Sequence, residues 1–140
     1  MANEAALRLK LDEACPFTCA DGTGIAKGAL LKLTDPRTAI ISSAAADKIA
    51  GICAREKVAS DGRTECDVYR RGWFDMSCSG SVNIGDPVVA ADTSVYPNFV
   101  GAAAITASGA NIIGHALEAG TNGEVILIDV NIGAGSGAVS

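Results

Sequence analysis

The sequence is poor in aromatic side chains, and it contains no long apolar run. Only six of its 140 residues are Phe, Tyr or Trp, whereas alanine and glycine together supply 41. A membrane-spanning helix needs about 18 or more consecutive apolar residues. The sequence has no such stretch, so no membrane-spanning helix is expected. Residues 1–10 lack a basic segment followed by an unbroken apolar run, so a secretory signal is not expected either.

Clustered positive charge is also lacking. The formal net charge is −5, and the eleven Lys and Arg residues are dispersed along the chain. Affinity for nucleic-acid phosphates requires grouped Lys and Arg. We therefore expect no nucleic acid and no membrane among the partners, and a free protein that its charge keeps soluble.

The cysteines are odd in number and widely spaced, which favours reduced thiols over a disulfide scaffold. They are Cys15, Cys19, Cys53, Cys66 and Cys78. The only close pair is Cys15-Pro-Phe-Thr-Cys19, whose spacing is one residue longer than that of common zinc and redox hairpins. Ordinary buried or half-buried thiols are favoured over a zinc site or a Cys15–Cys19 disulfide.

The larger aliphatic residues favour strands. Val and Ile total 22 residues against ten for Leu and Met, and β-branched side chains pack well on a pleated sheet. Strands are expected at 29–33, 38–42, 48–53, 65–70, 73–78, 87–90, 111–117 and 124–132. The last is an unbroken apolar stretch, which predicts a central strand with both faces covered. Short helices are expected at 43–48 and 101–108, which are rich in alanine.

The two ends of the chain differ from its middle. Leu7, Leu9 and Leu11 alternate with basic residues, and turn formers follow as far as Gly24, so residues 1–24 are interpreted as an extended arm outside the core. Residues 25–132 are expected to form the body, and 133–140 a flexible Gly/Ser tail.

A weak internal repeat runs through the body. Segment 28–35 resembles 85–92, segment 48–53 resembles 111–116, and segment 61–69 resembles 122–130. Each half thus has a first strand, a connecting segment of variable length, a strand centred on glycine and a last strand. Two copies predict a pseudo-duplicated small β-barrel, whereas a solenoid needs at least three.

Side chains that carry chemistry are few. The one histidine, His115, lies in an apolar strand and is expected to be partly buried. Asp61, Asp86 and Asp92 adjoin Gly or Pro, or lie at turns, where short carboxylates cap the backbone. The densest group of arginine and aromatic residues has two interpretations. It contacts another protein chain, because these residue types anchor interfaces, or its Trp73 or Phe74 caps the end of the barrel. Its members are Tyr69, Arg70, Arg71, Trp73 and Phe74.

Six short segments together resemble the capsid decoration (head-decoration or cement) proteins of tailed bacteriophages, broadly those of the lambda head-decoration type. They include Ile49-Ala-Gly-Ile52, Ser79-Gly-Ser-Val-Asn-Ile-Gly-Asp-Pro-Val88 and Ile113-Gly-His-Ala-Leu-Glu118, and the others are 28–31, 61–64 and 71–74. The resemblance implies a mainly β, β-barrel or β-tulip fold and a homotrimer that binds the major capsid protein. It implies a location on the capsid exterior after synthesis in the host cytoplasm, stabilisation of the mature shell, no cofactor and no catalytic residues.

On this hypothesis the arm contacts the capsid through Leu7, Leu9, Leu11 and Phe17, while residues 69–74 lie at a contact between subunits or with the shell. Two alternatives remain open. Tyr69-Arg-Arg-Gly-Trp-Phe-Asp75 faintly resembles the substrate motif of trimeric nucleotide hydrolases, which predicts an enzyme on a small β fold. The duplication also resembles that of biotinyl carrier domains, but Lys32 lies inside an apolar run and fits their modified lysine poorly.

Overall fold

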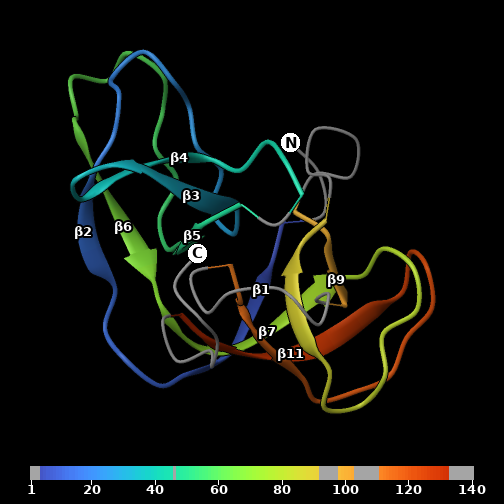
Figure 1. The fold of residues 1–140 in the computed structure, drawn as a ribbon. Helices are drawn as coiled ribbons and strands as arrows, with labels where there is room; N and C mark the ends of the chain where they lie inside the picture. The colour runs from blue at the N-terminus through green and yellow to red at the C-terminus, as the bar shows by residue number, and fades with distance from the viewer. Residues whose placement is uncertain (1–3, 46, 92–97, 103–110, 133–140) are drawn as a thin grey trace.

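Eleven short strands form the regular structure of this protein (Figure 1), for which a computed structural model describes residues 4–45, 47–91, 98–102 and 111–132. The strands are β1 (Ala6–Lys10), β2 (Cys15–Thr18), β3 (Leu30–Asp35), β4 (Thr38–Ile41), β5 (Ile49–Cys53), β6 (Glu65–Tyr69), β7 (Arg71–Ser77), β8 (Pro87–Ala90), β9 (Val100–Ala102), β10 (Gly114–Ala116) and β11 (Val125–Asn131). Within these residues the chain forms no helix, and so none that is long and apolar enough to cross a membrane.

The first half of the chain forms a closed five-stranded barrel, in the order β2-β4-β3-β5-β6. Its strands pair antiparallel except where β2 meets β4, which pair in parallel at Thr18 and Thr38. The predicted small β-barrel is therefore confirmed for this half. In Figure 1 the barrel strands gather on one side of the molecule, and β1, β7, β9 and β11 lie on the other.

The second half forms a five-stranded antiparallel sheet to which the N-terminal strand β1 adds a sixth strand, in the order β1-β7-β11-β10-β8-β9. The strand expected at 124–132 is β11, and it lies between β7 and β10 as predicted. Its two faces differ, however. Ile126, Ile128 and Val130 are buried, whereas Val125 is exposed and Leu127 is only half-buried. The expectation that both faces are covered was wrong, and one face of the sheet remains open.

The predicted duplication is confirmed by the strand pairing. Strands β2 to β6 pair among themselves in the same order as β7, β8, β9, β10 and β11. The parallel contact of Thr18 with Thr38 has its counterpart in a parallel bridge between Cys78 and Val100. The antiparallel bridge between residues 25 and 57 likewise corresponds to one between 82 and 120. Strand β1 has no counterpart in the other half.

A glycine permits a close approach of backbones in each half. Gly51 lies in β5 where that strand approaches β6, and a Cβ there would meet the carbonyl oxygen of Tyr69. Gly114 occupies the same position in β10, where a Cβ would meet the carbonyl oxygen of Asp129. Gly51 also has φ of 151°, which disfavours other residues. The two glycine-centred motifs of the repeat therefore mark positions that a side chain would block.

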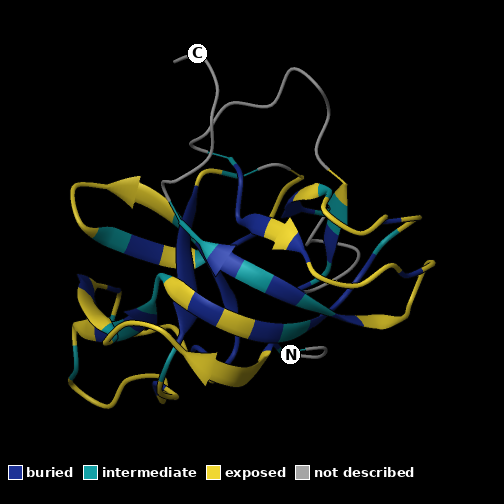
Figure 2. Cartoon of the chain, turned by 90° about the horizontal axis from the view of Figure 1, so that it is seen from below, coloured by how far each residue is buried: buried dark blue, intermediate teal, exposed yellow. Residues whose placement is uncertain are grey.

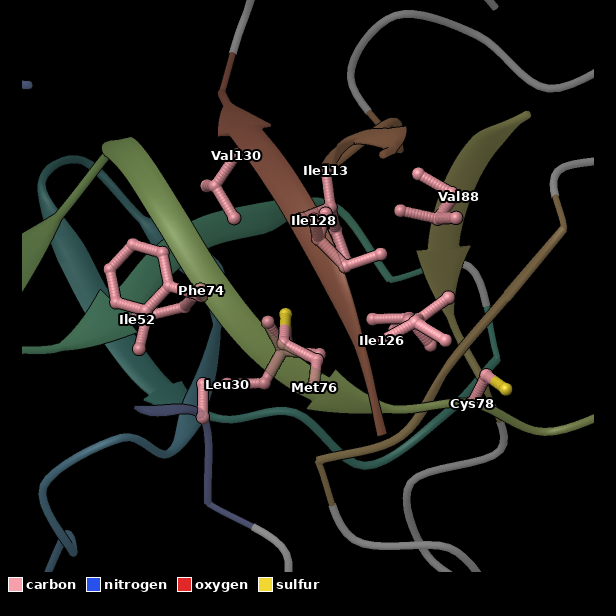
Figure 3. Packing of buried hydrophobic residues seen from close by; sticks show 14 of the residues in the cluster. Leu30, Ile52, Phe74, Met76, Cys78, Val88, Ile113, Ile126, Ile128 and Val130 are labelled. Atoms are coloured by element: carbon pink, nitrogen blue, oxygen red, sulfur yellow. The ribbon is translucent and has the colours of Figure 1, made fainter. Parts of the chain in front are cut away.

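The halves share one hydrophobic core. Leu30, Ile49 and Ile52 of the barrel half pack in the same buried cluster as Phe74 and Met76 of the sheet half (Figure 3). A second cluster fills the barrel, with Phe17, Cys19 and Val68 among its members. Because three barrel residues complete the core of the sheet half, the two halves form one packed body.

Residues 4–24 belong to the body, which corrects the predicted arm. β1 pairs with β7, and β2 pairs with both β6 and β4, so β2 is one of the barrel strands. Phe17 is 7% exposed and Cys19 is 3% exposed. The sequence pattern failed at β2 because a four-residue strand containing Pro16 shows little alternation. The predicted tail, 133–140, and residues 1–3 lie outside the described residues.

The described residues of the segment 43–48, which are 43–45, 47 and 48, do not form the predicted helix. Instead, the Asp47 carboxylate accepts hydrogen bonds from the backbone N–H groups of Ser43 and Ala44, at 2.9 and 3.0 Å, and from the Ser42 hydroxyl at 2.8 Å. An aspartate that satisfies nearby backbone groups stabilises a turn in competition with a helix. The second predicted helix begins within β9, which includes Gly101 and Ala102, and residues 103–108 lie outside the described part of the chain.

Candidate interaction surface

The open face of the six-stranded sheet displays the chain's one tryptophan. Buried and exposed residues alternate along strands of the protein (Figure 2), and on β7 this alternation leaves Trp73 38% exposed and Phe74 1% exposed. Gly72 allows β1 to lie against β7, because a Cβ at that position would come within 2.8 Å of the Leu9 carbonyl oxygen. The pairing then places Leu9 directly opposite Trp73. Two apolar side chains from distant parts of the sequence thus meet on the surface.

A row of side chains continues across the sheet from this point. Leu9 is paired with Trp73, Trp73 with Asp129, Asp129 with His115, and His115 with Pro87. His115 is exposed on this face. The expected partly buried histidine is therefore corrected, because the inward positions of β10 belong to Gly114 and Ala116.

A shallow hollow of about 420 Å³ lies beside Trp73. It is lined by Arg8, Leu9, Trp73, Asp75, Glu118 and Leu127, which we call the Trp73 surface. At its rim, Arg8 Nη1 is 2.8 Å from Asp75 Oδ2. The Glu118 carboxylate accepts a hydrogen bond from the Leu127 backbone N–H, also at 2.8 Å. An apolar centre with a charged rim is the usual composition of a protein–protein contact.

The leucines predicted to contact a capsid are exposed as that hypothesis requires. Leu7, Leu9 and Leu11 are 37%, 43% and 45% exposed, and β1 pairs through β7 alone, so it forms one edge of the sheet. Phe17 differs from them, because it lies in the barrel core with the Arg70 guanidinium carbon 5.9 Å from its ring centre. Phe17 is therefore a core residue in this structure.

The side chains of the predicted cluster at 69–74 do not lie together, because some are at the surface and others are in the core. Arg71 and Trp73 are exposed, while Tyr69 is half-buried with its ring 5.8 Å from that of Phe74. Phe74 itself is in the core, so it is not available to a partner. The residues that join Trp73 at the surface are instead Leu9 and Leu127. Leu9 was among the predicted contact leucines, but only the register of β1, β7 and β11 brings it and Leu127 beside Trp73.

A buried lysine forms a charged cluster that the sequence did not reveal. The Lys57 side chain is fully buried, and its Nζ donates to the Asp21 carbonyl oxygen at 2.8 Å and to Asp61 Oδ1 at 3.2 Å. Asp21 Oδ1 lies 3.6 Å from the same nitrogen. The pKa of Asp61 is lowered by a hydrogen bond from the Arg63 backbone N–H and by Lys57. These contacts tie the turn after residue 57 to the loop at 21, so the cluster has a structural role.

The cysteines are free, and all but Cys15 are buried. The predicted burial is therefore found for four of the five cysteines and not for Cys15. Burial raises the pKa of Cys53 and of Cys78, and it raises the pKa of Cys66 to about 12. Within the described ranges, no group of three or more His, Cys, Asp or Glu side chains is arranged to hold a metal ion.

The residues on which the two alternative functions were based make contacts within the protein. Of the faint nucleotide motif, Tyr69 packs on Phe74 and Asp75 pairs with Arg8. Lys32 lies within β3 and donates a hydrogen bond to the Ser43 hydroxyl at 2.7 Å. No observation on these residues favours either alternative.

The fold places the chain among small duplicated β-barrel proteins. It is similar to a solved structure described as the crystal structure of head fiber gp8.5 N base in bacteriophage phi29, with a TM-score of 0.56 and 12% sequence identity. The similarity covers 91% of this chain and 99% of that one. No family model matches the sequence, and neither does any curated protein. At this identity the similarity establishes a common fold.

Proposed function

We propose that this chain is a structural protein of a bacteriophage virion, which binds the exterior of the capsid and stabilises the mature shell as a homotrimeric cement. The observation that carries the proposal is the likeness to the phi29 head fiber base, which extends over nearly the full length of both chains. The sequence segments that resemble capsid decoration proteins support the same role independently. The proposal involves no cofactor and no catalytic step.

The Trp73 surface is the contact that we assign to the capsid. It combines the exposed Trp73 with the exposed Leu9 of the edge strand β1, and Arg8 and Asp75 lie at its rim. Tryptophan and arginine are the residue types that most often dominate binding energy, particularly when a partner excludes water from them.

Stabilisation of the shell would follow from selective binding. A trimer that spans neighbouring capsid subunits makes its contacts only when those subunits have the mature arrangement. A ligand that binds one state in preference to another shifts the equilibrium toward the bound state. The decorated shell would therefore resist heat and internal pressure better than the bare shell.

Binding to expanded empty shells of the capsid protein from the same genome tests this proposal. We expect the wild-type protein to co-sediment with the shells and to be trimeric when bound, as measured by cryo-electron microscopy. Trp73→Arg should weaken binding by about thirty-fold or more, the effect of losing a dominant interface residue. A point variant is preferable to deletion of residues 1–24, because that deletion would remove β2 from the barrel.

Ile84→Arg is the matched control. Ile84 is 73% exposed at the turn before β8, and it does not line the Trp73 surface. This variant should bind as the wild type does. Wild-type protein that fails to bind shells would overturn the proposed function, and normal binding by Trp73→Arg would overturn the assigned surface. Magnesium-dependent hydrolysis of nucleotides by the pure protein would support the enzymatic alternative instead.

A further inference from the structure

Carboxylates outnumber cations around the exposed tryptophan. Among the side chains that line the Trp73 surface, Arg8 is a cation, whereas Asp75 and Glu118 are anions. A third carboxylate lies beside this surface, because β11 pairs Asp129 directly with Trp73. The Arg8 guanidinium is already bound to Asp75, at 2.8 Å. The surroundings of the tryptophan therefore attract a further cation.

The Asp129 carboxylate is the group that lacks a partner. It is half-buried, and it makes no hydrogen bond or ion pair with any group in the described part of the chain. Its cross-strand neighbours are Trp73 on one side and His115 on the other. Arg71 lies two residues before Trp73 on β7, opposite Asn131. Because partial burial of an uncompensated charge costs free energy, Asp129 favours a partner that brings a cation to it.

The side chain that suits both the ring and the carboxylate is arginine. A guanidinium group stacks on aromatic rings, binds carboxylates through two parallel hydrogen bonds, and is less strongly hydrated than an ammonium group. Trp73 is 38% exposed and lines a hollow of about 420 Å³. Leu9 and Leu127 line the same hollow and offer apolar surface to the methylene stem of an arginine.

We propose that the Trp73 surface binds an arginine side chain of the capsid protein, with its guanidinium group against the Trp73 ring and paired with Asp129. This inference rests on the proposed function, since the capsid supplies the arginine. Asp75 already has Arg8 as its partner, so Asp129 is the residue that determines specificity for the cation. An apolar or acidic side chain in the same place would leave Asp129 uncompensated.

Binding of variants to expanded empty shells tests the role of the charge. Asp129→Asn removes one negative charge and keeps the shape of the side chain, so it should weaken binding by about ten-fold or more. The matched control is Glu56→Gln, which removes an exposed carboxylate that lines a different hollow. It changes the net charge equally and should bind as the wild type does.

Salt dependence and substitution of the ring provide readouts that a merely structural role would not change. Wild-type binding should weaken between about 0.05 and 0.5 M NaCl, and binding by Asp129→Asn should weaken less. Trp73→Phe keeps an aromatic ring, so it should retain part of the affinity that Trp73→Leu loses. Circular dichroism confirms that each variant is folded.

Cryo-electron microscopy of the decorated shell identifies the occupant directly and requires only the wild-type protein. We expect an arginine of the capsid protein on the Trp73 ring, within hydrogen-bond distance of Asp129. Equal binding by Asp129→Asn and Glu56→Gln, or a side chain of another type on the ring, would overturn the assigned arginine while the proposed function stands. If the wild-type protein does not bind shells, the proposed function fails and this inference fails with it.

Discussion

The two halves share a strand order but differ in what fills them and in which strands flank them. The first half closes into a barrel through β2 and β4, and it contains a buried lysine and three thiols. In the second half β7 is longer than its counterpart β2 and pairs with β1 as an added edge strand, and the exposed Trp73 lies beside it. Both halves therefore have the same framework of strands, and the one added strand, β1, gives the second half a surface for a partner.

The residues at two equivalent positions show the same divergence. Lys57 and Gly120 occupy corresponding bridges with Ile25 and Val82. The lysine bonds to two aspartates, whereas a Cβ at Gly120 would lie 2.6 Å from the Ile126 side chain. Each half thus fills the space beneath its bridge differently, with a charged side chain in one and a neighbouring isoleucine in the other.

The largest effect is expected at the two equivalent glycines. Gly51→Ala and Gly114→Ala should each destabilise the protein by about 3–5 kcal/mol, because the added Cβ meets a backbone carbonyl oxygen that cannot move freely. Urea unfolding of purified variants measures this. Gly22→Ala is the control, since no other atom lies within 4 Å of the place that its Cβ would take. If only one of the two alanine variants is destabilised, the two halves are not packed equivalently.

The charged cluster offers the next largest effect, confined to the first half. Lys57→Ala should cost about 3–5 kcal/mol, because it empties a buried site and leaves carboxylate and carbonyl groups without their partner. Lys57→Met keeps the aliphatic volume and should cost less. Arg55→Ala breaks only an exposed pair with Asp67, 3.6 Å apart, and should cost about 1 kcal/mol or less.

Equilibrium unfolding at neutral pH distinguishes these variants. Equal losses for Lys57→Met and Arg55→Ala would contradict a structural role for the buried charge, and they would make the two halves more alike than their contacts indicate.

The smallest effect is an acid sensitivity present in both halves. Burial would raise the pKa of Asp47, but its hydrogen bonds from Ser42, Ser43 and Ala44 lower it below 3.8. Hydrogen bonds from the Thr121 backbone and hydroxyl lower the pKa of Glu124 below 4.5. Each lowered pKa contributes stability that is present above these ordinary values and is lost as the pH falls through the lowered ones.

Unfolding free energies measured between about pH 6 and pH 3 test this linkage. Asp47→Asn in the first half and Glu124→Gln in the second should each reduce the dependence on pH. If the stability of a variant falls with acid as steeply as that of the wild type, the carboxylate replaced in that variant does not contribute to the pH dependence.

Several features could be predicted from the sequence because they depend on local patterns. The excess of Val and Ile indicated strands, and the glycine-centred segments around Gly51 and Gly114 indicated the duplication. Alternation along 73–78 required Trp73 and Phe74 to face opposite ways, although it did not say which one faced outward. The strand β2 was missed, because four residues that include Pro16 carry too little periodicity to be distinguished from a turn.

The sequence by itself determined the strand-rich composition, the repeat and the glycine at the centre of one strand in each half, since each depends on residue type and spacing. Tertiary structure alone decided that Leu9 and Leu127 flank Trp73 and that Lys57 meets Asp21. Those contacts join residues distant in the chain, and they depend on strand register. A register shift of one residue would turn every side chain to the opposite face.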